Sequence, residues 1–186
     1  MKNKTGLLPA NGHRIQGRSS EEFLDTVEIL DELNLKGNEN FMDVGCGDGH
    51  VAIKALDYLS EGNVYALDIY EPSVEDMEEF KKENNVDNLF PIQSNVSEKI
   101  DLDDDTLDDA FMVNVFHGFT ASRTTDEAIS ELKRVIKPEG GRIAIMDYKK
   151  QDVKHGPPYA IRSTPDELRR EFIKHGLVMT HLNEEI

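Results

Sequence analysis

The sequence predicts an α/β protein in which a doubly wound, mostly parallel sheet carries helices on both faces. The first observation behind this prediction is segment 41–59, where a short apolar run leads through a glycine-rich turn into an amphipathic helix. The second is that further short apolar runs alternate with helical patterns along the chain, which is typical of parallel strands joined by crossover helices. We therefore expect strands at 41–44, 63–68, 89–93, 107–117 and 142–147.

Length and composition indicate a single domain spanning residues 1–186, in which residues 1–18 form an amino-terminal arm. Hydrophobic residues make up 38% of the chain, but no apolar run approaches the roughly 20 residues needed to span a membrane. The amino terminus lacks the apolar segment of a signal peptide, and the one cysteine, Cys46, cannot form an intramolecular disulfide. We therefore expect a soluble, cytoplasmic protein with no membrane partner.

The chain is strongly acidic, with a net charge of −16 from 21 basic and 37 acidic residues. Such a charge repels a phosphate backbone, so we expect no nucleic-acid partner. The acidity fits a solubilising surface or, alternatively, an acidic docking face. The six histidines and the acids lack H-x-x-x-H or C-x-x-C spacing, so no built-in metal site is expected.

The amino-terminal arm is followed by the pattern of an amphipathic helix. Ser19 and Glu22 have the spacing of a capping box, which predicts that this helix begins after Ser19. Apolar residues then recur at helical spacing until Gly37, which is expected to end the helix. These apolar residues are Phe23, Leu24, Val27, Leu30, Leu33 and Leu35.

The glycine-rich turn has the clearest chemical meaning. Asp43 precedes Gly45, Gly47 and Gly49, which are spaced G-x-G-x-G. Alternating glycines allow a sharp turn and let a ligand lie against bare main chain, while N–H groups at the start of the helix can hold an anionic group. This predicts a nucleotide-like ligand, although the spacing differs from the G-x-G-x-x-G of dinucleotide-binding proteins. The alternative is a structural glycine turn in an unrelated α/β protein.

The segment D-V-G-C-G-D-G at 43–49 resembles the first motif of the class I S-adenosylmethionine (SAM)-dependent methyltransferases. Asp68, which closes the second strand, matches their second motif and is placed to accept both ribose hydroxyls. The resemblance runs from Ser20 to Leu182 and implies a Rossmann-like fold with strand order 3-2-1-4-5-7-6. It also implies SAM as the cofactor and S-adenosyl-L-homocysteine as the product. The residues that it places at the cofactor are Asp43, Gly45, Cys46, Gly47, Gly49, Asp68, Ile69, Asn95, Val96 and Asn114.

The third strand, Leu89–Gln93, is predicted to lie at an edge of the sheet. Pro91 within it cannot donate to a ladder, and this agrees with the strand order that the resemblance implies. Directly after it, Asn95 falls where the family usually has an acid that contacts the adenine amino group. An amide oxygen can still accept from that group, so Asn95 remains a candidate adenine contact. Before this strand, Pro72 opens a charged helix that extends through Asn84.

The predicted fourth strand, 107–117, follows an acidic run at 101–105 that we expect to be a solvated loop. The end of the strand should lie beside the glycine turn, so residues 114–117 are expected to flank the reacting methyl group. His117 is the candidate general base, because histidine titrates close to neutral pH. A positioning or packing role is the alternative. Methyltransferases of ubiquinone and menaquinone biosynthesis, the branch that the chain resembles, often carry a histidine here.

A helix at 124–136 is predicted to end at the proline and glycine turn 137–141, and the fifth strand, 142–147, follows. Asp147 and Tyr148 then fall at the carboxyl edge of the sheet as candidate substrate contacts.

The substrate pocket is expected to have two further walls. The long loop 149–162 is predicted to be a pocket wall or a lid. In the family the amino-terminal arm often covers the pocket, and His13 and Arg14 would then face an anionic substrate. A loose tail is the alternative.

The last predicted helix begins at the capping box of Thr164 and Glu167 and extends through Lys174. Residues 177–182 are predicted to form a sixth strand. Because only residues 183–186 follow it, the seventh strand is expected to be missing, which leaves six strands and an open edge on the fifth. We expect a second copy to cover this edge, as a homodimer, or the edge to be mobile.

These features together predict SAM-dependent methyl transfer to a small-molecule acceptor by in-line displacement. Such chemistry depends on alignment and desolvation more than on a strong base. One alternative is a SAM-binding protein without turnover, in a regulatory or assembly role. Another is a nicotinamide-dependent oxidoreductase, which the glycine spacing disfavours.

Overall fold

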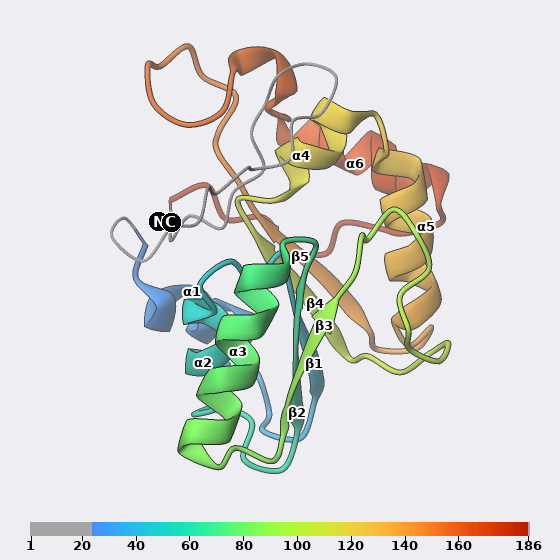
Figure 1. Ribbon diagram of the computed structural model, residues 1–186. Helices are drawn as coiled ribbons and strands as arrows, with labels where there is room; N and C mark the ends of the chain where they lie inside the picture. Colours follow the sequence, from blue (N-terminus) through green and yellow to red (C-terminus); the bar gives the residue numbers. More distant parts are fainter. Residues whose placement is uncertain (1–23, 186) are drawn as a thin grey trace.

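The computed structural model describes residues 24–185 and shows a sheet between two layers of helices (Figure 1). The strands are β1 Asn40–Val44, β2 Asn63–Asp68, β3 Leu89–Gln93, β4 Asp109–Val113 and β5 Arg142–Met146. The helices are α1 Thr26–Leu33, α2 His50–Ala55, α3 Glu71–Asn84, α4 Phe116–Ser122, α5 Thr125–Val135 and α6 Pro165–Lys174, with a 3-10 helix, η1, at Tyr159–Ile161. No helix in this part of the chain is long and apolar enough to cross a membrane.

The sheet has the strand order β3-β2-β1-β4-β5, and every neighbouring pair is parallel. This confirms the predicted fold class and the order of the first five strands. β3 lies at an edge of the sheet, as its Pro91 predicts. The connections reverse direction between β1 and β4, which is where ligands bind in doubly wound folds.

Apolar side chains fill both faces of the sheet, because successive residues of a strand point to opposite faces. Phe41 of β1 packs with apolar residues of α1, α2 and α3 in one buried cluster. Its neighbour Met42 packs with residues of α4, α5 and α6 in a second cluster. The first three helices therefore cover one face and the last three cover the other.

The first helix begins later than the capping-box pattern predicts. α1 starts at Thr26, and the Asp25 carboxylate accepts the N–H groups of Val27 and Glu28 at 3.0 and 3.3 Å. Asp25 satisfies these first-turn donors and so fixes the start of the helix, which makes the predicted start after Ser19 wrong. Ser19 itself and the predicted arm, 1–18, lie outside the described residues.

The fourth strand is shorter than predicted, because the chain turns at its end. β4 stops at Val113, and Asn114 adopts a left-handed conformation with φ of 58°. Asparagine tolerates this conformation better than most residues. The following residues form α4, which the sequence analysis missed, and His117 therefore lies in the first turn of a helix instead of at the end of a strand.

Residues 177–182, predicted as a sixth strand, form no strand. The described part of the chain has a five-stranded sheet, so the prediction of six strands is wrong. Side chains hold this segment instead: Arg169 of α6 donates to Sδ of Met179 at 3.6 Å, and His181 Nε2 lies 2.6 Å from Glu32 Oε1 of α1. In the implied order a sixth strand pairs with a seventh, and no seventh strand occurs among the described residues. A second copy covering the outer edge of β5 stays a prediction.

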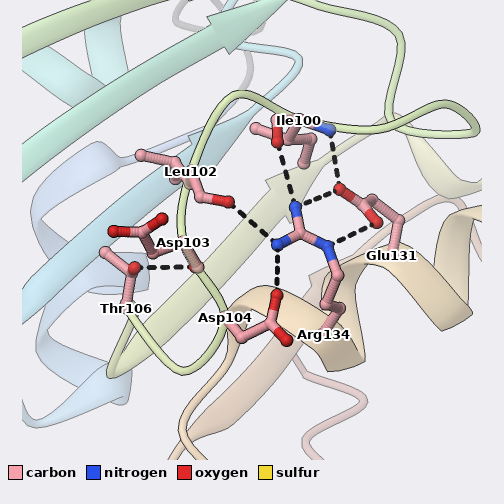
Figure 2. A network of polar contacts seen from close by, with 7 residues as sticks. All are labelled: Ile100, Leu102, Asp103, Asp104, Thr106, Glu131 and Arg134. Carbon is pink, nitrogen blue, oxygen red and sulfur yellow. Dashed lines mark hydrogen bonds and ion pairs between the residues drawn. The ribbon is translucent and has the colours of Figure 1, made fainter.

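One arginine of α5 holds the acidic loop that precedes β4, as Figure 2 shows. The Arg134 guanidinium donates to the carbonyls of Ile100 and Leu102 at 2.9 Å and to Asp104 at 2.7 Å. It also donates twice to Glu131, whose Oε1 accepts the Ile100 N–H at 2.6 Å. The loop is mostly exposed, as predicted, but its backbone has a fixed partner that its charge pattern does not reveal.

Replacing Arg134 by alanine should lower the free energy of unfolding by about 2–3 kcal/mol, because two carbonyls and two carboxylates lose a charged donor. Its side chain is 22% exposed, so water recovers part of the loss. Urea denaturation measures the change. Arg170→Ala is the matched control, because Arg170 is exposed and its side chain makes no hydrogen bond or ion pair with any described residue. Equal effects of the two variants would contradict the role given to Arg134.

Candidate functional site

The carboxyl ends of β1, β2, β4 and β5 meet at one edge of the sheet, beside the point where the strand order reverses. The glycine-rich turn follows β1, Asp68 closes β2, and Asn114 and Asp147 directly follow β4 and β5. The topology therefore brings the predicted site residues of four strands to one place, where ligands of such folds bind.

The glycine turn packs so closely against its neighbours that side chains do not fit at two of its positions. Gly45 has φ of 76°, and a Cβ there would lie 2.6 Å from Cγ2 of Val115. Gly49 has φ of 81°, and a Cβ there would overlap the Met77 side chain of α3. The Gly45 N–H donates to the Leu67 carbonyl of β2 at 2.7 Å. Glycine is thus required at both positions by conformation, and at Gly45 also by packing against the branched side chain of Val115.

Asp68 joins the glycine turn to the end of β2. Its Oδ2 accepts the Gly47 N–H at 2.9 Å, and its Oδ1 accepts the Tyr70 N–H at 2.8 Å. Burial raises the pKa of the Asp68 carboxyl, while the hydrogen bonds from Tyr70 and Gly47 act in the opposite direction. Each carboxylate oxygen has a second lone pair, so both can still accept from ribose hydroxyls.

Asp43 reaches from β1 to the helix that follows the turn. Its Oδ2 accepts the Ala52 N–H at 3.1 Å, and the residue is only 2% exposed. Burial raises the pKa of Asp43 from 3.8 to about 7; the Ala52 hydrogen bond lowers it, and the charges of Asp68 and Asp48 raise it further. Asp43 is therefore partly protonated near neutral pH.

We expect Asp43→Asn to become more stable relative to the wild type as the pH rises. The folded pKa of Asp43 lies above the ordinary value, so the folded state keeps a proton that the unfolded state releases between about pH 4 and pH 7. The contribution of Asp43 to stability therefore falls with rising pH, by up to about 1.4 kcal/mol per pH unit in this window. Asparagine stays neutral and keeps an oxygen for the Ala52 N–H. Denaturant unfolding of both proteins at pH 5 and pH 7.5 tests this, and a constant difference between them would contradict it.

The remaining predicted cofactor residues follow the ends of β1, β2 and β3. Cys46 is buried, and burial raises the pKa of its thiol, which keeps it protonated and unreactive. Val96 is buried and Ile69 is half-buried. The side-chain oxygen of Asn95 accepts the N–H and the hydroxyl of Ser97 at 3.1 and 2.8 Å. It is thus engaged within its own loop, and its contact with adenine stays a prediction.

The structure pairs His117 with Asp147, which follow different strands. The Nδ1 atom of His117 lies 2.8 Å from Oδ1 of Asp147, and the backbone N–H of His117 donates to Oδ2 at 2.9 Å. His117 is 9% exposed. A carboxylate beside Nδ1 favours the tautomer that carries its proton there, which makes Nε2 the accepting nitrogen. The Tyr148 ring lies edge-on to this imidazole, with the two ring centroids 6.4 Å apart.

Two predicted substrate residues, His13 and Arg14, lie outside the described residues. A cavity of about 550 Å³ between α1 and α2 borders the glycine turn at Asp48 and His50, but its lining contains none of the predicted cofactor residues. Within 24–185, no group of histidines, cysteines and acids is arranged to hold a metal ion.

A family model described as a methyltransferase domain matches residues 35–181, which is most of the chain. The chain belongs to the methyltransferase-domain family. A solved SAM-dependent methyltransferase from Aquifex aeolicus is 31% identical, with a TM-score of 0.73, and the match covers 83% of this chain and 80% of that one. The predicted membership of the SAM-dependent methyltransferases is therefore confirmed.

Two further methyltransferases resemble the chain less closely. The probable methyltransferase ltbC of Aspergillus luteorubrus is 28% identical over 119 residues, which are 61% of this chain and 41% of that protein. The match thus spans about two-fifths of that relative. Phosphoethanolamine N-methyltransferase 2 of Haemonchus contortus, solved with phosphomonomethylethanolamine and S-adenosylhomocysteine, is 18% identical with a TM-score of 0.66, over 81% of this chain and 36% of that one. This second likeness shows the fold alone, and the resemblance to the ubiquinone branch stays a prediction.

Sequence patterns missed two features of this methyltransferase site. The pair of His117 and Asp147 spans 30 positions, and only the fact that β4 and β5 end at the same edge could have indicated it. Arg162, buried under the loop that follows β5, carries no pattern signal at all.

Proposed function

We propose that this methyltransferase moves the methyl group of SAM to a small-molecule acceptor by in-line displacement. The observation that supports this most directly is the convergence of two groups at one sheet edge. Asp68 and the glycine turn form the first group, and His117 with Asp147 forms the second. The first group suits a nucleoside, and the second suits an acceptor that gives up a proton.

The residues of the chain fit the cofactor that the family uses. Both Asp68 oxygens can accept ribose hydroxyls, and the Gly45 backbone is left without a side chain where the methionine portion would lie. Ile69, Asn95 and Val96 are proposed to contact the adenosine part. When bound, SAM supplies an activated sulfonium methyl group, and the protein supplies alignment and the exclusion of water.

His117 is proposed to take a proton from the acceptor. Asp147 holds the imidazole from the Nδ1 side, so that Nε2 is the nitrogen able to receive that proton. The same carboxylate stabilises the imidazolium that results. The acceptor is proposed to be a small molecule, because the net charge of −16 opposes nucleic acid, and the single cysteine agrees with a cytoplasmic location.

Calorimetric titration with SAM tests the cofactor part of this proposal. We expect SAM or S-adenosylhomocysteine to bind and a nicotinamide dinucleotide to give no heat, because the glycine spacing and Asp68 suit a single nucleoside. The reverse result would refute the methyltransferase proposal.

A screen with methyl-labelled SAM over a deproteinised cell-extract fraction then separates an enzyme from a SAM-binding protein without turnover. A labelled small-molecule product identifies an enzyme. Tight SAM binding with no labelled product in any fraction would favour the regulatory or assembly role.

A further inference from the structure

A buried arginine lies at the centre of the loop that follows β5. Arg162 is 3% exposed, although residues 151–156 of the same loop are exposed. Its Nε donates to the Pro157 carbonyl at 2.8 Å, and its Nη2 donates to the His155 carbonyl at 2.5 Å. Its Nη1 donates to two more carbonyls, those of Lys149 and Gln151, at 3.2 and 3.1 Å. The loop is thus folded around a cation instead of an apolar core.

The same guanidinium lies over the ring of Tyr148, with 5.6 Å between Cζ and the ring centroid. Gly156, with φ of 77°, approaches this ring so closely that a Cβ there would lie 2.6 Å from two ring carbons. The His155 ring lies 6.3 Å from the Tyr148 ring between centroids. Tyr148 is therefore confined by groups from across the loop, and its backbone N–H donates to Asp147 at 2.7 Å.

No carboxylate of the described chain forms an ion pair with Arg162. Carbonyl dipoles and the face of Tyr148 compensate its charge instead. Arginine presents several N–H groups in a rigid, planar fork, so this arrangement specifies the path of the loop more closely than a lysine would. A second contact fixes the loop to α6, since Lys150 Nζ lies 2.8 Å from Glu167 Oε1.

We infer that Arg162 is a positioning residue for the methyl acceptor, acting through Tyr148. The inference rests on the proposed function, because it takes the space beside His117 and Tyr148 as the acceptor site. Arg162 fixes the loop around Tyr148, and Tyr148 forms a rigid wall next to the His117 imidazole. The loop after β5 is therefore a preformed wall of the acceptor site, held from within by one cation.

A double-mutant cycle on Arg162 and Tyr148 tests the inference. The variants are Arg162→Lys, which keeps the charge, Tyr148→Ala, and the two together. Turnover is followed as S-adenosylhomocysteine formation with a serially diluted, deproteinised cell-extract fraction, and SAM affinity is followed by calorimetry. We expect Arg162→Lys to raise the half-saturating amount of extract by about ten-fold and to change SAM affinity by less than about two-fold. In the Tyr148→Ala background, Arg162→Lys should raise the half-saturating amount of extract by less than about two-fold.

Gly156→Ala supplies a second route to the same ring, because the added Cβ would lie 2.6 Å from two ring carbons of Tyr148 while the Arg162 side chain itself is kept. It should reproduce the rise in half-saturating extract, and it keeps the inference testable if Arg162→Lys does not fold. Lys154→Ala is the matched control, since Lys154 is exposed on the same loop and its side chain makes no hydrogen bond, ion pair or ring contact with Arg162 or Tyr148. A folded Arg162→Lys protein with unchanged saturation, or an undiminished effect in the Tyr148→Ala background, would overturn the inference.

NMR of tyrosine ring signals separates this inference from the proposed function. Tyr148→Phe assigns the signal, and we expect Arg162→Lys and Gly156→Ala to shift it toward the position of Tyr159, which is 53% exposed. If the wild type methylates nothing in the extract while these shifts occur, the proposed function fails and the role of Arg162 in holding Tyr148 stands. If the Tyr148 signal does not move in either variant, the positioning role is refuted whatever the turnover.

Discussion

Replacing Asp68 by alanine should weaken SAM binding by about 1.5–3 kcal/mol for each charged hydrogen bond lost, which is about ten- to 150-fold in Kd per bond. The proposed bonds run from the ribose hydroxyls to the carboxylate. The structure gives a second reason to expect weaker SAM binding, because Asp68 also accepts the N–H groups of Gly47 and Tyr70. Its loss therefore releases the glycine turn that would hold the rest of the cofactor.

Isothermal titration with SAM measures the effect, and thermal denaturation checks that the variant is folded. Asp101→Ala removes an equal charge from the exposed acidic loop and should leave the SAM affinity unchanged. Asp68→Asn keeps one accepting oxygen and should fall between the wild type and Asp68→Ala. A folded Asp68→Ala protein with wild-type affinity would reduce Asp68 to a structural residue.

Replacing His117 by alanine should lower turnover by about 10²–10⁴-fold, the range found for removal of a general base, with SAM affinity nearly intact. His117 contacts Asp147 and Tyr148, which follow β5, whereas Asp68 closes β2. Asp147→Asn should produce a smaller loss of turnover, because the imidazole remains but its Nδ1 no longer faces a carboxylate.

Single-turnover kinetics with labelled SAM measures these rates at several pH values. The wild-type rate should rise with pH, and the His117→Ala rate should be flat. His181→Ala is the matched control, since His181 contacts Glu32 at the opposite face of the sheet from α4. Full turnover in His117→Ala, together with a flat wild-type profile, would assign His117 to packing.

The sequence by itself determined most of the fold and the placement of the glycine turn and Asp68 at the carboxyl edge of the sheet. The bounds of β2 and β3 and the capping box of α6 agree with the sequence patterns because their causes are local. A strand that is mostly buried, such as β2, requires a short apolar run, and the edge strand β3 tolerates Pro91. A cap requires a hydroxyl and a carboxylate at fixed spacing. The glycine turn is also local, since the positive φ of Gly45 and Gly49 must be encoded at those positions.

Only the tertiary structure decided which residues meet in the proposed acceptor half of the site and where the sheet ends. The pair of His117 and Asp147 and the enclosure of Tyr148 by Arg162 join segments whose separation carries no periodicity, so no local pattern encodes them. Residues 177–182 also show that a local pattern does not by itself decide the structure. Their apolar pattern is compatible with a strand, but a strand forms only where a neighbouring backbone offers a ladder. Here side chains of α1 and α6 contact the segment, and it pairs with no strand of the described sheet.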